Sequence, residues 1–150
     1  MSIEPGVVDA NILVYGVDAR AVQHASSRAL LDAAQDPATT LYLTSQILCE
    51  FYSIVTNPRR IAVPRSPLEA LHAISALLSL PGIRVLPTPA QAVVGWMVLL
   101  QRHPVTGGDV FDLQLVATMQ ANNVQRIYTF NTKDFAVFTE LTVLAPAEVA

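Results

Sequence analysis

Residues 6–15 read GVVDANILVY, and this stretch decides how the rest of the chain is interpreted. Its first three residues are small or apolar, and its last four, residues 12–15, are all large and apolar or aromatic. A short apolar run bounded by turn-forming polar residues is typical of a strand buried in a parallel sheet. We therefore predict a strand that ends at Asp9, then a turn through Asn11 into a helical segment.

Working outward, predicted strands alternate with predicted helices along the whole chain. Strands are expected at residues 41–43, 83–86, 126–129 and 141–144, and helices at residues 25–34, 46–56, 67–79, 89–102 and 110–121, with one helical turn within 132–138. This alternation predicts an α/β fold of three layers, in which a mostly parallel central sheet of about five short strands is flanked by helices. No repeat or linker interrupts it, so residues 1–150 are expected to form a single domain.

Four helix starts carry sequence signals. Ser66-Pro67-Leu68-Glu69 forms a capping box with proline at the first helical position. Residues 88–91, Thr-Pro-Ala-Gln, repeat that signal. Thr44 or Ser45 is expected to cap the helix at 46–56, and Asp109 the helix at 110–121.

Composition excludes several classes of protein. Apolar residues make up 52% of the 150 residues and charged residues 14%, a balance opposite to that of disordered chains. The one cysteine, Cys49, excludes a disulfide framework and a cysteine-based zinc site, and we expect it to be a small core residue. No signal segment or apolar run of membrane-spanning length is present, so we expect no membrane association and a cytoplasmic location.

The net charge of −3 argues against nucleic-acid binding by bulk charge. Contact with a polyanion would need a local basic patch or bound cations. Such a patch is available in the sequence as Arg59, Arg60, Arg65 and Lys133, although a set of solvated surface charges explains these residues equally well.

Three of the few acids stand among apolar neighbours. Asp9 lies between Val8 and the run at 12–15, Glu50 is spaced with Ile47 and Ile54, and Asp112 precedes an apolar stripe at 115–119. Ligands of open α/β sheets bind at the carboxyl ends of strands. If the first and fourth predicted strands are neighbours, the three acids converge with a polar set that follows the fourth strand, namely Thr129, Asn131 and Asp134.

Converging carboxylates repel one another unless a cation neutralises them. Oxygen ligands without histidine or cysteine suit Mg²⁺ or Mn²⁺ better than zinc. Single-residue alternatives stay open: Asp9 as a helix cap, Glu50 paired with Arg59 or Arg60, and Asp112 as a first-turn acid favoured by the helix dipole.

Four pieces of the sequence, in order, resemble the PIN-domain family and, within it, the VapC-like toxins of bacterial toxin–antitoxin pairs. They are VDAN at residues 8–11, SQILCEFY at 45–52 with TNPRR at 56–60, FDLQLVAT at 111–118, and YTFNTKDF at 128–135. The resemblance spans nearly the whole chain.

The resemblance implies a Mg²⁺- or Mn²⁺-dependent endoribonuclease that dimerises and is inhibited by a small antitoxin. Asp9, Glu50 and Asp112 correspond to its metal-site acids. Asn131 stands where many members carry aspartate, so Asp134 is expected to supply the fourth carboxylate. Expected contacts to RNA complete the hypothesis: Thr129 and Asn131 orient the water or scissile phosphate, and Asn11, Arg59, Arg60 and Lys133 bind substrate.

Three other functions compete with this one. A phosphoacceptor receiver module would also have an acidic pocket at strand ends, but it needs an aspartate at the end of the third strand, where residues 83–86 have none. A PIN-like scaffold that only binds RNA or protein is favoured by Asn131. A PIN-fold nuclease outside toxin–antitoxin systems, acting on DNA or flap structures, is the closest rival.

Overall fold

The computed structural model describes residues 3–148, and its centre is a five-stranded sheet in which every neighbouring pair is parallel. The strand order is β3-β2-β1-β4-β5. The strands are β1 Gly6–Val8, β2 Leu41–Thr44, β3 Ile83–Leu86, β4 Arg126–Tyr128 and β5 Thr142–Leu144. The helices are α1 Ala10–Val17, α2 His24–Asp32, α3 Ser45–Val55, α4 Pro67–Leu78, α5 Gln91–Arg102, α6 Val110–Ala121 and α7 Thr132–Phe135, with 3₁₀ turns η1 Ala33–Gln35, η2 Gly107–Asp109 and η3 Pro146–Glu148.

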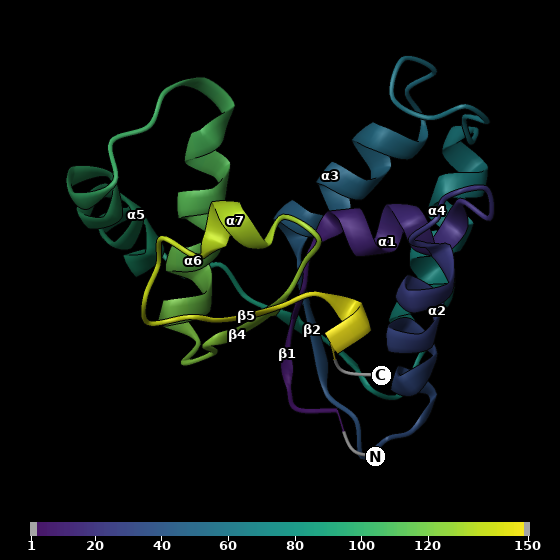
Figure 1. Ribbon diagram of the computed structural model, residues 1–150, viewed down its shortest axis with the longest axis horizontal. Coiled ribbons are helices and arrows are strands. Elements are labelled where there is room, and N and C mark those ends of the chain that lie inside the picture. Colours follow the sequence, from purple (N-terminus) through teal and green to yellow (C-terminus); the bar gives the residue numbers. More distant parts are fainter. Residues whose placement is uncertain (1–2, 149–150) are drawn as a thin grey trace.

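Helices cover both sides of this sheet, so the expected three-layer α/β architecture is confirmed. Helices α1 to α4 lie on one side and α5 to α7 on the other (Figure 1). The chain steps outward from β1 to β2 and β3, then returns across the sheet to β4 and β5. Because parallel crossovers are right-handed, reversing the direction of travel moves the helices to the opposite face.

The reversal makes the boundary between β1 and β4 the topological switch point of the sheet. Ligands of open α/β sheets bind at such a point, beyond the carboxyl ends of the strands. Val8 of β1 is registered with Tyr128 of β4, so Asp9 and Thr129 leave the sheet side by side. The order also differs from the 2-1-3-4-5 order of the receiver fold, which removes that alternative.

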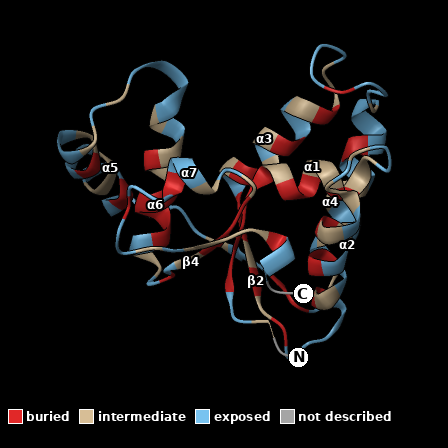
Figure 2. Ribbon diagram, viewed as in Figure 1, coloured by how far each residue is buried: buried red, intermediate tan, exposed pale blue. Residues whose placement is uncertain are grey.

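The central strands are buried on both faces, as their apolar sequences predict. Val7, Val8, Leu41, Leu43 and Ile127 are fully inaccessible to solvent. Figure 2 shows this core as the buried strands between the two helical layers. Such burial fixes the positions of the strand ends, and therefore of the side chains that follow them.

Two of the four predicted helix starts are confirmed. The Thr44 hydroxyl accepts a 3.1 Å hydrogen bond from the Ile47 amide, and Ser66 and Glu69 form the reciprocal capping box. Thr88 is wrong as a cap because α5 begins at Gln91, after Ala90. Asp109 is also wrong as a side-chain cap. Ala90 and Asp109 both have helical backbone angles, whereas a capping side chain needs an extended backbone.

Cys49 corrects a second expectation. Helix α3 buries Ile47, Phe51 and Val55 against the sheet, and Cys49 lies off this stripe and is exposed. Within residues 3–148, no helix combines the length and the apolar character needed to cross a membrane.

Candidate acidic site at the sheet switch point

Asp9 is the buried centre of the site. It ends β1 and begins α1 in an extended conformation, and its Oδ1 accepts a 2.8 Å hydrogen bond from the Ala10 amide. Its own amide donates to the Tyr128 carbonyl at 3.0 Å, which continues the β1–β4 pairing. Asp9 therefore does cap a helix, as one alternative proposed. Only 7% of its surface is exposed, so the carboxylate is held in a fixed position.

A small network of neutral groups ties Asp9 to the end of β4. The hydroxyl of Thr129, which is fully buried, donates to Asp9 Oδ2 at 2.7 Å. Asn11 Nδ2 donates to Thr129 Oγ1 at 3.2 Å and reaches Asp9 Oδ2 at 3.4 Å, while Asn11 Oδ1 accepts from the Phe130 amide at 3.3 Å. Both ends of the Asn11 amide are thus used inside the protein. Its expected role in binding substrate stays a prediction.

Glu50 is half-buried on α3, and a glutamine one turn before it holds its side chain. Gln46 Nε2 donates to Glu50 Oε1 at 3.1 Å and to the backbone carbonyl of Phe111 at 2.8 Å. Gln46 therefore links α3 to the start of α6, on the opposite side of the sheet. Sequence reasoning missed this residue, although positions i and i+4 share a helix face.

Asp112 lies half-buried in the first turn of α6. Burial raises its pKa from the usual 3.8 to about 6, with further contributions from the negative charges of Asp9, Asp134, Glu50 and Asp109. Asp109 was not expected to take part. It contributes here through its charge.

The other acids show the same mutual effect. Burial raises the pKa of Asp9, the bonds from Thr129 and Ala10 oppose the rise, and the charge of Asp134 adds to it. Burial likewise raises the pKa of Glu50, opposed by Gln46 and reinforced by Asp9. Acids from four separate segments therefore lie near enough for their charges to act on one another.

Basic side chains do not neutralise these acids. Across residues 3–148, the one ion pair is Arg28 with Asp32, on the surface of α2. The alternative that Glu50 pairs with Arg59 or Arg60 is therefore wrong. Arg65 donates to the Val17 carbonyl at 2.6 Å and so serves the fold.

The carboxylates of these acids are suitable ligands for a hard cation, although their side chains do not lie close enough together to form one coordination sphere. Carboxylate oxygens are what Mg²⁺ and Mn²⁺ prefer, and the excess negative charge is what a dication removes. Among the described residues, no three acid, histidine or cysteine side chains lie close enough to hold one metal ion as they stand. A shared ion would therefore require these side chains to come closer together.

Two cavities flank the acids. One, of about 290 Å³, has Asp109, Asp112, Asp134 and Lys133 in its wall. The other, of about 530 Å³, is lined by Gln46, Cys49, Glu50, Ser53, Ile54, Arg60 and Phe111. The site is thus open to a ligand on both sides.

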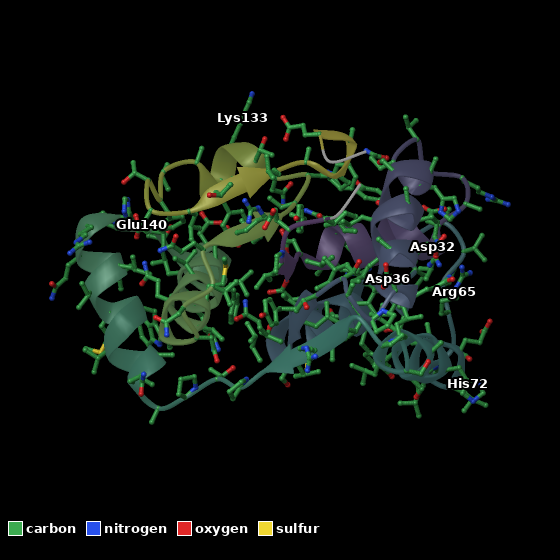
Figure 3. All side chains as sticks on the ribbon, turned by 90° about the horizontal axis from the view of Figure 1, so that it is seen from below. Asp32, Asp36, Arg65, His72, Lys133 and Glu140 are labelled. Atoms are coloured by element: carbon green, nitrogen blue, oxygen red, sulfur yellow. The ribbon has the colours of Figure 1, made fainter. Side chains whose placement is uncertain are left out.

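The remaining expected residues lie at the rim. Asn131 is exposed, and its backbone amide donates to Thr129 Oγ1 at 3.0 Å. Arg59 and Arg60 are exposed in the loop after α3. Lys133 extends outward from α7 (Figure 3), although part of it borders the smaller cavity.

Comparison with known proteins gives a consistent picture. The PIN domain family model matches residues 6–141. A VapC ribonuclease of Mycobacterium bovis and ribonuclease VapC43 of Mycobacterium tuberculosis are each 33% identical over 116 residues, which is 77% of this chain and 79% of theirs.

Solved structures share the fold at lower identity. VapC20 of Mycobacterium tuberculosis, described as a sarcin-ricin loop cleaving toxin, has a TM-score of 0.66 and 20% identity, with coverage of 89% of this chain and 95% of that one. VapBC-1 of nontypeable Haemophilus influenzae has a TM-score of 0.65 and 18% identity over 96% of this chain and 99% of that one.

Proposed function

This chain belongs to the PIN-domain family, and from that premise we propose that it is a divalent-metal-dependent endoribonuclease acting as the toxin of a toxin–antitoxin pair. The observation that carries the proposal is the meeting of Asp9, Glu50, Asp112 and Asp134: burial and neighbouring negative charges raise the pKa values of the first three, and none of the four has an ion-pair partner in residues 3–148. The relatives named as VapC ribonucleases support RNA as the substrate.

Mg²⁺ or Mn²⁺ is the proposed cofactor, with Asp9, Asp112, Asp134 and Glu50 as the residues that would hold it. When bound, such an ion supplies polarisation of a phosphate oxygen and a more acidic water. Asn131 contributes an amide in place of a carboxylate, so Asp134 is proposed to provide the fourth negative charge. Its charge already acts on Asp9 and Asp112, which supports this assignment.

The chain's own groups are proposed to position the reacting atoms. The bonds from Thr129 and Ala10 hold Asp9 in one orientation, and Thr129 also accepts from the backbone of Asn131. The exposed side-chain amide of Asn131 is proposed to orient the attacking water or the scissile phosphate. The proposed contacts to flanking phosphates are Arg59, Arg60 and Lys133, which would provide the local positive charge that a chain of net charge −3 lacks.

A small antitoxin is the proposed protein partner, and a homodimer the proposed assembly. Neighbours of this fold were solved as toxin–antitoxin complexes, including one from Klebsiella pneumoniae, which supports the first point. Co-purification with the product of an adjacent short reading frame tests the antitoxin, and light scattering of the purified chain tests the dimer.

The decisive experiment compares Asp9→Asn and Asp112→Asn with the wild type. Single-stranded RNA cleavage should require Mg²⁺ or Mn²⁺, stop in EDTA and be lost in both variants. Asp36→Asn is the matched control, because Asp36 precedes β2 at the opposite edge of the sheet and an asparagine oxygen can still accept the bond from the Ala38 amide. Cleavage at the wild-type rate by a folded Asp9→Asn protein would reject the acidic site as the catalytic site, whereas a folded wild type that cleaves no RNA with any metal would leave the scaffold alternative.

A further inference from the structure

We propose that the cavity of about 530 Å³ beside Glu50 binds one unstacked nucleobase of the RNA, with the ring of Phe111 as the stacking surface. This inference rests on the proposed function and adds a recognition subsite to it. The volume is within the roughly 300–1,000 Å³ of small-molecule sites. The cavity borders Glu50, so its occupant would lie next to the scissile phosphate.

Phe111 is the first reason. It precedes Asp112 in the chain, and 53% of its surface is exposed, whereas residues 115–119 of the same helix are buried. An exposed aromatic ring next to the proposed active site contributes no hydrophobic stabilisation from burial in the core. Aromatic rings that face solvent in single-strand binding proteins stack on bases, and this needs no particular sequence because every base has a π-face.

Gln46 is the second reason. It donates to Glu50 Oε1 at 3.1 Å and to the Phe111 carbonyl at 2.8 Å, so one side chain sets the spacing between the acid and the stacking residue. Within residues 3–148 its Oε1 accepts no hydrogen bond, which leaves an acceptor available for an amino group of a base. The cavity therefore combines an aromatic surface with a polar group that can read a base edge.

The other lining residues supply charge and shape. Arg60 lines the cavity and has no ion-pair partner among the described residues, so its guanidinium is free to bind the phosphate of the same nucleotide or to stack on the base. Ile54 and Cys49 provide apolar contacts, and the Ser53 hydroxyl adds a small polar one. This set suits a neutral, flat, hydrogen-bonding ring with a phosphate attached.

The substrate class follows from the geometry of such a site. A base inside an A-form helix is stacked and cannot enter a cavity, whereas bases of loops and single strands can be splayed out. The inferred substrate is therefore single-stranded or loop RNA, with one base near the cleaved bond held by Phe111.

The test combines a protein change with an RNA change. Abasic nucleotides are placed one at a time on either side of the cleavage site of a single-stranded RNA, and kcat/KM is measured for the wild type, Phe111→Ala and Phe111→Tyr. At one position, base removal should lower the wild-type value by about 5- to 150-fold, the range expected for one stacked base. Removal of the same base should leave the kcat/KM of Phe111→Ala almost unchanged. Phe111→Tyr should respond to base removal as the wild type does.

A binding measurement keeps the test independent of turnover. In an Asp9→Asn background, fluorescence anisotropy of the same RNAs should show the same position dependence for Phe111, with Met97→Ala on α5 as the control for loss of an exposed apolar side chain. Equal effects of base removal in wild type and Phe111→Ala at every position would overturn the subsite, while cleavage itself would still support the nuclease.

Two other outcomes also decide against the subsite. If Phe111→Ala converts a dimer into monomers in light scattering, the ring is an intersubunit contact and the base-binding inference fails. If the wild type cleaves no RNA with any metal, the proposed function fails first and the subsite with it. Both outcomes can be told apart from the case in which the enzyme is active and its kcat/KM does not depend on Phe111.

Discussion

The hydroxyl of Thr129 donates a 2.7 Å hydrogen bond to Oδ2 of Asp9, joining the ends of β4 and β1 across 120 positions of sequence. Both residues are buried, at 0% and 7% exposure. The bond lies at the switch point between β1 and β4, so it couples the fold to the geometry of the acidic site. Thr129 is therefore a positioning residue that acts through Asp9.

Thr129→Val should reduce cleavage while keeping the fold, because it preserves shape and removes the donor. Loss of a group that orients a metal-binding side chain costs roughly 10- to 100-fold in activity or metal affinity. Asp9 would lose the bond that lowers its pKa, so the acid limb of the pH–rate profile should move to higher pH. Thr129→Ser keeps the hydroxyl and should restore both the rate and the profile. Equal loss in both variants would contradict this role.

Asp112→Asn should stabilise the metal-free protein even as it removes activity. Asp112 is charged at neutral pH against the repulsion of Asp9, Asp134, Glu50 and Asp109. Removing that charge should raise the unfolding free energy by roughly 1 kcal/mol, after discounting for solvent screening of a half-exposed group. Chemical denaturation in EDTA at pH 7.5 measures the change, and a less stable variant would argue against repulsion among the acids.

The effect of Mg²⁺ on stability should grow with pH. The pKa of Asp112 is raised in the folded protein from 3.8 to about 6, so the folded state holds its proton more tightly than the unfolded state. Stability from this group is therefore present below about pH 4 and is lost as pH rises through 6. A dication binds the deprotonated form of Asp112, so the rise in Tm that Mg²⁺ produces should be larger at pH 7.5 than at pH 5. The difference between wild type and Asp112→Asn isolates this group, and a pH-independent shift would contradict it.

The fold was predictable because its signals are local. Apolar runs such as residues 6–8 and 41–43 mark buried parallel strands, and the Ser66–Glu69 box marks a helix start. Thr88 and Asp109 failed as caps because a capping residue is recognised by its backbone angles, which neighbouring residues set. Near Asp109, Gly107 adopts φ +60° and the chain enters a 3₁₀ turn before α6 begins.

The acidic residues of the site could be predicted from the sequence, but the residues that hold them in position could not. Asp9, Glu50 and Asp112 stood out because burying an acid among apolar residues is costly. Gln46 gave no such signal, since its role depends on the Phe111 carbonyl, 65 residues away. Cys49 was misplaced because the buried stripe of α3 runs through Ile47, Phe51 and Val55, and Cys49, two positions after Ile47, lies outside it. Contacts between distant segments decide these details.

Gly82→Ala should destabilise the fold through backbone crowding. A Cβ at this position would lie 2.7 Å from the Thr39 carbonyl oxygen and 2.8 Å from that of Ala34. The Gly82 amide also donates to the Ala34 carbonyl at 2.7 Å, so the backbone at Gly82 cannot move away from that at Ala34 without losing this bond. A cost of about 1–3 kcal/mol is expected from overpacking. Gly108→Ala is the control, because a Cβ there has no neighbour within 4 Å. Urea denaturation curves compare the two, and equal midpoints would contradict the crowding.

Arg59 and Lys133 should contribute to RNA affinity by charge and without regard to sequence. Both are exposed and without an ion pair within residues 3–148, and they lie on opposite sides of the acids, after α3 and on α7. Each phosphate contact on a single strand contributes about 0.7 to the slope of log K against log salt concentration. Arg59→Gln and Lys133→Gln should each lower that slope by about this amount in an Asp9→Asn background.

Arg84→Gln provides the matched control, because it removes the same charge from the edge strand β3, two strands away from β1. Its slope should equal that of the parent protein. The losses at Arg59 and Lys133 should be the same for RNAs of different sequence, because phosphates carry no sequence information. An unchanged slope for either variant would remove that residue from the phosphate contacts, and an equal loss in Arg84→Gln would mean that RNA responds only to net charge.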